Sequence, residues 1–271
     1  MSATETQTAV RYEKDADGIV TLTLDDPTAS ANTMNDLYRA SMASAIDRLY
    51  DELAADESSV KGVVIASAKK TFFAGGNLKG MVQAGPADAE DVFRMAEDVK
   101  AGLRRLEKLP KPVVAAINGA ALGGGLEITL ACNRRVCVDD RSVKLGLPEV
   151  SLGLLPGGGC VTRIVRMFGL QDGLMSVLLE GKQFSPQQAL EKGLVDELVA
   201  TREEGADVMQ QLAFGLRLSQ ELAYLYGHRL SAGDHEGAPL TDAELDQLLL
   251  DRKSTRLNSS HSGESRMPSS A

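Results

Sequence analysis

Hydrophobic and polar positions alternate along residues 12–199 with two different periods, that of a strand and that of a helix. Short β-branched or apolar runs predict strands, and longer segments with apolar residues every three or four positions predict helices. The expected strands are Ile19–Leu24, 63–66, Val113–Ile117, 136–138, 144–146 and 194–199. The expected helices are 34–53, 87–109, 161–168 and one that begins at Pro186. This repeated alternation of strands and helices indicates an α/β fold.

Several of these segments also predict how they pack. Residues 63–66 (VVIA) form a continuous apolar run, as expected for a strand that is covered on both faces. Two helices carry core-facing stripes at helical spacing. The first comprises Met34, Leu37, Met42, Ala45, Ile46, Leu49 and Leu53, and the second Val92, Met95, Val99, Leu103 and Leu106. The pattern predicts two further strands, at 136–138 and 144–146, joined by a polar connection.

The last predicted helix of this region has clear end signals. Ser185 is a suitable N-cap, Pro186 occupies the first helical position, and Gln188 completes a capping box. Gly193 supplies the C-terminal stop. The helix therefore lies between residues 185 and 193, just before the short strand 194–199.

The pattern changes after residue 199. Residues 206–230 have the spacing of an amphipathic helix, and Thr241 to Glu244 form a capping box for another. From residue 252 onward the chain is serine-rich and nearly free of apolar side chains, so it cannot bury enough surface to offset its ordering entropy. We expect a core in residues 1–200, a helical region in 201–250 and a disordered tail in 251–271.

Composition removes several classes of protein. The chain has 271 residues, of which 43% are hydrophobic and 25% charged, values of an ordinary globular protein. No apolar run approaches the about 18 residues that span a bilayer, and residues 1–11 lack a signal-peptide pattern, so we expect a cytoplasmic protein. The net charge of −9 disfavours nucleic-acid binding.

Cysteine and histidine usage narrows the chemistry further. The three cysteines are Cys132, Cys137 and Cys160, an odd number without the spacing of a zinc site, so we expect neither a disulfide framework nor a bound metal. The three histidines, His228, His235 and His261, all follow residue 200. Histidine-based catalysis is therefore excluded from the α/β part.

Two glycine-rich segments follow predicted strands. They are residues 72–81 (FFAGGNLKGM) and 118–127 (NGAALGGGLE). Free backbone N–H groups at such a strand-to-helix turn favour negative charge. Neither segment matches the dinucleotide-binding fingerprint or a phosphate-binding P-loop. The alternative is that both are tight turns without a ligand.

Two glutamates lie in apolar sequence surroundings. Glu127 closes the second glycine segment, and Glu149 lies within the segment 145–150 (LGLPEV). A desolvated carboxylate has a raised pKa, as a general acid or base near neutral pH requires. The alternative is that both glutamates act as helix caps or salt-bridge partners. Cys160 follows a third glycine-rich turn, but no nearby histidine could activate it, so we interpret it as structural.

The segments FFAGGNLKGM, NGAALGGGLE and GLPEVSLGLLPGGG, in this order and spacing, resemble the crotonase (enoyl-CoA hydratase/isomerase) superfamily over about residues 10–200. The resemblance implies a ββα spiral core. The last motif is most similar to the N-terminal hydratase module of multifunctional fatty-acid-oxidation α-subunits, in which a 3-hydroxyacyl-CoA dehydrogenase part follows. That part is not recognised in this sequence, and NAD is expected only if it followed.

The resemblance also implies the roles of individual residues. The peptide N–H groups of Gly76 and Gly124 match the oxyanion hole of the family. Glu149 matches the glutamate that exchanges the proton at C2 of the substrate, and Glu127 matches the one that holds and activates water. Both carboxylates together favour an enoyl-CoA hydratase of fatty acid β-oxidation. The alternatives are an enoyl-CoA isomerase, an acyl-CoA hydrolase, or a truncated subunit of a β-oxidation complex without catalytic activity.

The CoA part of the substrate would be bound by the first glycine segment. Ala74 and Leu78 match positions whose backbone lies against CoA, and the basic residues Lys69, Lys70 and Lys79 are candidates for contact with its phosphates. The alternative is that these long side chains are simply solvated. The family further implies no metal and no separate cofactor, a homotrimer or hexamer, and a thiolase partner. Residues 201–250 resemble none of the family's C-terminal helices. RKSTRLNSSHS, at the start of the tail, resembles translated adapter read-through, so we expect a truncated or frame-shifted product with a non-native tail.

Overall fold

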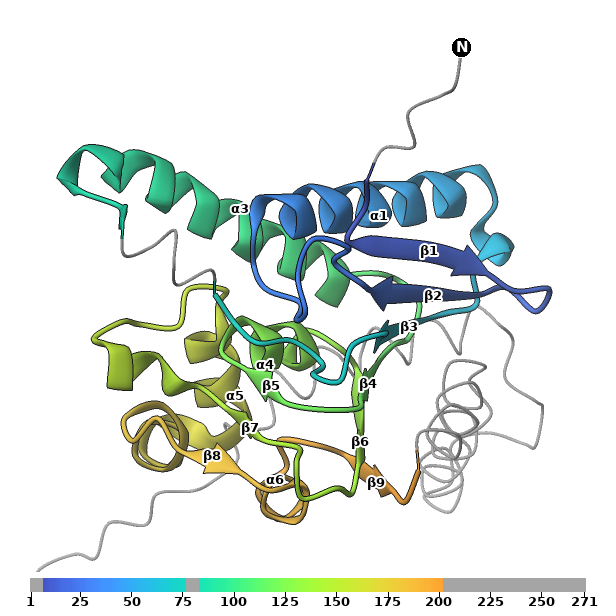
Figure 1. Ribbon diagram of the computed structural model, residues 1–271. Helices are drawn as coiled ribbons and strands as arrows, with labels where there is room; N and C mark the ends of the chain where they lie inside the picture. The colour runs from blue at the N-terminus through green and yellow to red at the C-terminus, as the bar shows by residue number, and fades with distance from the viewer. Residues whose placement is uncertain (1–6, 77–82, 202–271) are drawn as a thin grey trace, which may run out of the picture.

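Figure 1 shows the computed structural model, which describes residues 7–76 and 83–201. The larger sheet has six strands in the order β1-β2-β3-β4-β6-β9. They are β1 (Val10–Lys14), β2 (Ile19–Leu24), β3 (Gly62–Ser67), β4 (Val113–Ile117), β6 (Arg134–Val138) and β9 (Glu197–Val199). β1 and β2 are antiparallel, and each later neighbouring pair is parallel.

A smaller sheet has three short strands in the order β5-β7-β8. They are β5 (Ala121–Leu122), β7 (Leu145–Gly146) and β8 (Gln183–Phe184). The strands predicted at 136–138 and 144–146 both exist, but they belong to different sheets. Their polar connection therefore leads from the larger sheet to the smaller one.

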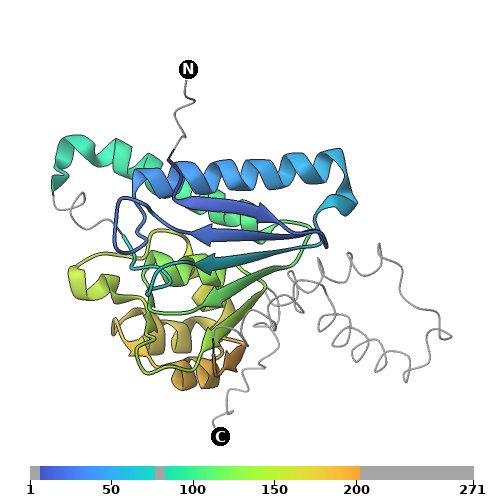
Figure 2. The same cartoon turned by 45° about the vertical axis from the view of Figure 1, so that its right-hand side comes forward.

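The helices complete the fold. They are α1 (Asp36–Ala55), α3 (Ala89–Glu107), α4 (Gly124–Leu130), α5 (Cys160–Gly173) and α6 (Pro186–Lys192). Short helical turns lie at Glu57–Ser59, Pro86–Asp88, Pro148–Leu152 and Leu174–Leu178. Figures 1 and 2 both show α1 and α3 together beside β1 and β2, and α4 and α5 beside the smaller sheet. The α/β fold expected from the alternation of elements is confirmed.

Strand β3 shows why the central strands have continuous apolar sequences. Val63 and Ile65 are buried in the main core, whereas Val64 and Ala66 pack in a second cluster. Successive side chains of a strand point to opposite faces, so both faces of β3 are covered. The interpretation of residues 63–66 as a strand buried on both sides is therefore confirmed.

Helix α1 begins later than predicted. Met34 was expected inside the helix, but Asn35 is the N-cap, and its side chain accepts a hydrogen bond from the amide of Tyr38 at 2.8 Å. A short polar side chain that binds a free helix amide fixes the start of the helix at this point. Met34 instead donates its backbone N–H to the carbonyl oxygen of Gly75. The rest of the predicted stripe is buried at Met42, Ala45, Ile46, Leu49 and Leu53.

Helix α3 also differs from its prediction. The expected range 87–109 divides into the turn Pro86–Asp88 and a helix that ends at Glu107. Of the predicted stripe, Leu103 and Leu106 are buried, but Val92 is 39% exposed. The first half of α3 extends past the neighbouring α1 (Figure 1), so its apolar side chains have less of the core to pack against.

The end signals of α6 are confirmed. The hydroxyl of Ser185 accepts from the amide of Gln188 at 3.3 Å, and the Gln188 side chain accepts from the amide of Ser185 at 3.0 Å. Gly193 ends the helix with a φ of +79°. The strand predicted at 194–199 is shorter, because the amides of residues 194 and 195 bind the carbonyl oxygen of Ala189 instead of a neighbouring strand.

Helix α5 is longer than the predicted range 161–168. It runs to Gly173 and is interrupted at Gly169, where φ is +79°. The predicted helical region 201–250, beyond residue 201, and the tail 251–271 lie outside the described residues. Within residues 7–76 and 83–201, none of the helices combines the length and apolarity needed to cross a membrane.

Candidate active site

The two glycine segments lie against each other beyond the ends of β3 and β4. The amide of Phe73 donates to the carbonyl oxygen of Ala120 at 3.0 Å, and the amide of Leu122 donates to that of Phe73 at 3.1 Å. A Cβ atom on Gly123 would lie 3.6 Å from Cα of Gly75. Both glycines have positive φ, +96° at Gly75 and +53° at Gly123, which L side chains rarely adopt. The turns therefore need glycine for their conformation and for their contact.

Gly76 and Gly124 lie at the point where these turns meet. Gly124 is the first residue of α4, where an amide N–H has no acceptor within the helix. A Cβ atom on Gly124 would lie 4.0 Å from the carbonyl carbon of Gly75, the atom that is bonded to the nitrogen of Gly76. Gly124 is buried and Gly76 is exposed. The structure thus brings together the two residues that were predicted to supply N–H groups.

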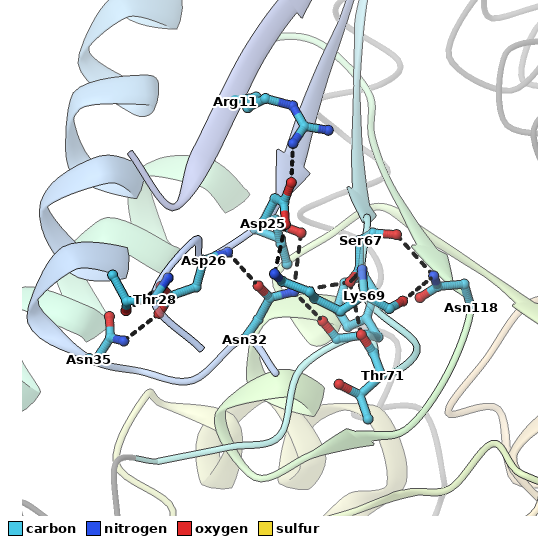
Figure 3. Close-up of polar contacts among 12 residues, drawn as sticks. Arg11, Asp25, Asp26, Thr28, Asn32, Asn35, Ser67, Lys69, Thr71 and Asn118 are labelled. Atoms are coloured by element: carbon cyan, nitrogen blue, oxygen red, sulfur yellow. Dashed lines mark hydrogen bonds and ion pairs between the residues drawn. The ribbon is translucent and has the colours of Figure 1, made fainter. Parts of the chain in front are cut away.

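The side chain of Asn32 holds the start of the first glycine segment through hydrogen bonds (Figure 3). Its Nδ2 donates to the carbonyl oxygens of Leu24 and Phe72, each at 3.2 Å, and to Oγ of Ser67 at 3.0 Å. Its Oδ1 accepts from the amide of Asp26 at 3.0 Å. Asn32 is buried, so these bonds are shielded from water. One side chain therefore joins the end of β2 to the turn that follows β3.

The backbone near Asn32 continues this attachment. The carbonyl oxygen of Asn32 accepts from the amide of Ala74 at 2.8 Å, and the amide of Met34 donates to the carbonyl oxygen of Gly75 at 2.9 Å. Ala74, predicted to contact CoA, is exposed beside the predicted oxyanion glycines. The peptide that leads into Gly76 is thus held by hydrogen bonds on the residues just before it.

Asn118 and Gly119 attach the second glycine segment to the residues that lead from β3 into the first. The side-chain amide of Asn118 donates to the carbonyl oxygens of Ser67 and Lys69, at 2.9 Å and 3.1 Å, as Figure 3 shows. A Cβ atom on Gly119 would lie 2.1 Å from the carbonyl oxygen of Lys70, a distance that no side chain can accept. Glycine at 119 therefore allows the second segment to pack backbone against backbone on the residues just before the first segment.

Glu127 points away from solvent into a cradle of backbone amides. It lies on α4, one turn after Gly123, and is only 4% exposed. Its Oε1 accepts hydrogen bonds from the amide of Gly158 at 2.7 Å and from that of Cys160 at 3.2 Å. These amides belong to the third glycine-rich turn. A buried carboxylate that is held by two donors has a fixed orientation, as an acid or base in catalysis requires.

Glu149 lies on the turn Pro148–Leu152 and approaches the second glycine segment. A Cβ atom on Gly123 would lie 2.7 Å from Oε1 of Glu149, and Oε2 is buried without a hydrogen-bond donor among the described residues. Burial raises the pKa of Glu149 to about 7, and the negative charge of Glu127 contributes to the rise. Of the two alternatives for this residue, a perturbed carboxylate within the site fits better than a helix cap or salt bridge.

Cys160 lies beside the same carboxylates. Its side chain is buried, and the pKa of its thiol is raised well above the ordinary value by burial and then by the charge of Glu127. A raised pKa keeps the thiol protonated, and the thiol is a weak nucleophile in that form. The structure therefore supports the structural interpretation of the Cys160 thiol, and the backbone amide of Cys160 contributes a hydrogen bond to Glu127.

The basic residues just before and within the first segment lie in different settings. Nζ of Lys69 is 2.9 Å from Oδ1 of Asp25, and its side chain is only 20% exposed, so an ion pair within the protein holds it (Figure 3). Lys70 is exposed. Leu78 and Lys79, predicted to contact CoA, lie outside the described residues. The prediction of a phosphate contact thus loses support at Lys69.

Three residues of this site were not predicted from the sequence. Asn32 holds the first glycine segment, Gly158 donates to Glu127, and Arg163 donates to the carbonyl oxygen of Gly158 at 3.0 Å. The run of three glycines at 157–159 was the available signal for Gly158, because a run of this kind indicates a close backbone approach. No local pattern distinguishes Asn32 or Arg163 from ordinary polar residues.

Comparison with known proteins places this geometry in context. The family described as Enoyl-CoA hydratase/isomerase matches residues 14–223. The chain is 44% identical over 183 residues to the fatty acid oxidation complex subunit alpha of Idiomarina loihiensis, and 46% identical over 182 residues to that of Shewanella loihica. These alignments include 68% and 67% of the chain but 25% of each relative, so the chain spans about a quarter of their length.

Solved structures share the fold. The enoyl-CoA hydratase from Bacillus halodurans superposes with a TM-score of 0.68 at 24% identity, covering 93% of this chain and 94% of that one. At this identity the likeness concerns the fold. It confirms the crotonase-type architecture that the three sequence motifs implied.

Proposed function

The chain belongs to the enoyl-CoA hydratase/isomerase family, the crotonase family, and on that premise we propose that it adds water across the double bond of a trans-2-enoyl-CoA. The product is a 3-hydroxyacyl-CoA, as in fatty acid β-oxidation. One observation favours hydration over isomerisation or hydrolysis. Two buried or half-buried carboxylates, Glu127 and Glu149, flank the second glycine turn, and Glu149 has a pKa of about 7. Addition of water needs both a base and an acid, and this pair supplies one of each.

The glycine turns stabilise the charge that forms during the reaction. The thioester carbonyl oxygen accepts hydrogen bonds from the amides of Gly76 and Gly124. Addition at C3 moves the electron pair of the double bond onto C2 and the thioester oxygen, giving an enolate. Donors that are already aimed at this oxygen stabilise the enolate more than the substrate, and one such donor typically contributes about 3 kcal/mol.

The glutamates handle the two protons. The carboxylate of Glu127, oriented by the amides of Gly158 and Cys160, accepts a proton from water as the water oxygen bonds to C3. The protonated carboxyl of Glu149 delivers a proton to C2. The proton on Glu127 then returns through solvent to Glu149, so the reaction consumes no net proton and restores the starting enzyme.

The remaining expectations follow from family membership and belong to the same proposal. CoA lies along Ala74, Leu78 and Lys79. No metal or separate cofactor takes part in hydration, and NAD would serve only a dehydrogenase part of a longer protein. The protein functions in the cytoplasm as a homotrimer or hexamer. A thiolase is the expected partner, because the relatives are named as subunits of a fatty acid oxidation complex.

The test uses purified protein and crotonyl-CoA. Hydration is followed as the loss of enoyl absorbance, and the product is identified by mass spectrometry. A gain in mass equal to one water molecule supports hydration. Unchanged mass with a moved double bond would indicate an isomerase, and free CoA a hydrolase. Glu127→Gln and Glu149→Gln should each lower kcat at least about 100-fold. Unchanged activity in both variants would overturn this mechanism, and folded protein without turnover would favour a subunit without catalytic activity.

A further inference from the structure

Arg163 occupies an unusual place behind the candidate site. It lies in the first turn of α5 and is only 8% exposed. Its Nη1 donates to the carbonyl oxygen of Gly158 at 3.0 Å, and its Nη2 lies 3.3 Å from Oε2 of Glu107, the last residue of α3. The guanidinium therefore connects the glycine turn to the end of another helix.

We propose that Arg163, fixed by Glu107, is a positioning residue that holds Gly158 so that its amide binds and orients the carboxylate of Glu127. The inference rests on the proposed function, in which Glu127 accepts a proton from water. Arg163 acts through Gly158, since the structure gives it no direct hydrogen bond to Glu127.

The glycine turn needs an external support of this kind. Residues 157–159 are three consecutive glycines, and among the described residues no atom lies within 4 Å of a Cβ placed on Gly157. Such a segment has many accessible conformations, and ordering it costs more entropy than ordering other residues. Gly158 is bound on both sides, through its N–H to Glu127 and through its C=O to Arg163. Without the guanidinium, Gly158 would keep the bond to Glu127 but lose the hydrogen bond that fixes its carbonyl oxygen.

Glu107 gives Arg163 its fixed orientation. Its Oε2 accepts from Arg163 and also from Nη1 of Arg104 at 2.6 Å. A buried guanidinium requires a charged partner, and its planar donors leave few orientations that satisfy both acceptors at once. A lysine could reach one acceptor but not present the same fork. Glu107 and Arg163 together thus define where the carbonyl oxygen of Gly158 can lie.

A purely structural ion pair between α3 and α5 makes a different prediction. Loss of a structural pair would lower stability and reduce every activity in step with the folded fraction. Loss of a positioning residue for Glu127 would reduce the addition of water but leave chemistry that uses Glu149 alone. Exchange of the C2 proton of butyryl-CoA with solvent is such a reaction. Glu149 takes the proton, the C–H electron pair moves to the thioester oxygen, and a deuteron returns from solvent.

The experiment compares both reactions at pH 7 in wild type, Arg163→Met, Arg163→Lys and the control Arg166→Met. Arg166 lies on the same helix but is exposed. Hydration of crotonyl-CoA and deuterium uptake at C2 of butyryl-CoA are measured on the same samples, with thermal unfolding to establish the folded fraction. In Arg163→Met, kcat of hydration should fall roughly 100-fold with KM and deuterium uptake nearly unchanged. Arg163→Lys should recover part of the loss, and Arg166→Met should match wild type.

The remaining outcomes separate the two proposals. Hydration at the wild-type rate in folded Arg163→Met, or an equal loss of hydration and exchange, would overturn the positioning role. If Arg163→Met does not fold, the same two rates are measured in Arg163→Lys and Glu107→Gln. A lower ratio of hydration rate to exchange rate than in wild type supports the positioning role, and an unchanged ratio overturns it. A wild-type protein that exchanges the C2 proton but does not hydrate would overturn the proposed function, and this inference with it.

Discussion

The amide nitrogen of Gly158 lies 2.7 Å from Oε1 of Glu127, and a Cβ atom on residue 158 would lie 2.6 Å from Oε2 of the same carboxylate. The φ of Gly158 is not positive, so its conformation does not require glycine. Glycine is required instead by the close approach of the Glu127 carboxylate. The contact with Glu127 therefore accounts for glycine at this position.

Gly158→Ala should lower kcat of crotonyl-CoA hydration by roughly 100-fold, because the new methyl group displaces the carboxylate of Glu127. The matched control is Gly157→Ala, in which the methyl group meets no atom of residues 7–76 and 83–201 within 4 Å. Steady-state kinetics of both variants, with circular dichroism to establish folding, provide the measurement. Equal activity in the two variants would contradict the proposed role of the 158 position.

The pH dependence of the reaction should follow Glu149, whose pKa is about 7. Hydration needs its protonated form, so kcat/KM for crotonyl-CoA should fall roughly tenfold per pH unit above about pH 7. The reverse reaction, dehydration of the 3-hydroxyacyl-CoA, should show the same fall in kcat/KM above about pH 7, because the reaction consumes no net proton. Exchange of the C2 proton of butyryl-CoA needs the ionised form and should rise through the same pH. If the rates of hydration and exchange both rose or both fell with pH, this assignment would be contradicted.

Glu149 should also cost stability at high pH. Its folded-state pKa of about 7 is above the ordinary 4.5, so the native state binds more protons than the unfolded state between these values. Stability is therefore highest below pH 4.5 with respect to this group and falls as the pH rises to about 7. Glu149→Gln removes the titration. Its Tm should exceed that of wild type by a few degrees at pH 8, and the difference should shrink at pH 5; a constant difference would contradict the shift.

Asn32 should matter for stability and for activity. Asn32→Ala leaves the hydrogen-bonding groups of Leu24, Ser67 and Phe72 without their buried donor, so we expect a loss of about 2 kcal/mol in the free energy of unfolding. Asn32→Asp should be worse, although the side chains have nearly the same shape, because a carboxylate would face two carbonyl oxygens. Denaturant unfolding measures both. An aspartate variant as stable as wild type would show that the Nδ2 donor is unimportant.

Cys160 should be dispensable as a thiol. Its side chain is buried and its pKa is raised, so native protein should resist iodoacetamide under conditions that alkylate the unfolded chain. Cys160→Ala should keep nearly full activity, because the bond to Glu127 comes from the backbone amide. Loss of hydration in a folded alanine variant would show that the thiol has a role of its own.

Local elements were predicted well where the determining interactions are close in sequence. The capping box of Ser185 and Gln188 and the stop at Gly193 formed as predicted, because each bond joins residues within one or two turns. Strand Val113–Ile117 has its predicted bounds, since proline precedes it and a continuous apolar run fills it. The prediction that Met34 lies in a helix was wrong because a distant contact decides its place, the hydrogen bond from its amide to Gly75. The strand at 145–146 was predicted, but its membership of a second sheet was not.

The sequence by itself determined the alternation of elements, the glycine segments, the two glutamates and, through three motifs, the family. Only the tertiary structure decided what holds those groups in place. Glu127 is bound by an amide 31 residues away, Arg163 pairs with a glutamate at a separation of 56, and Asn32 binds a carbonyl 40 residues along the chain. A motif states which residue types are close in sequence. Supports of this kind depend on which segments the packed core brings together, and a single sequence carries no local signal for that.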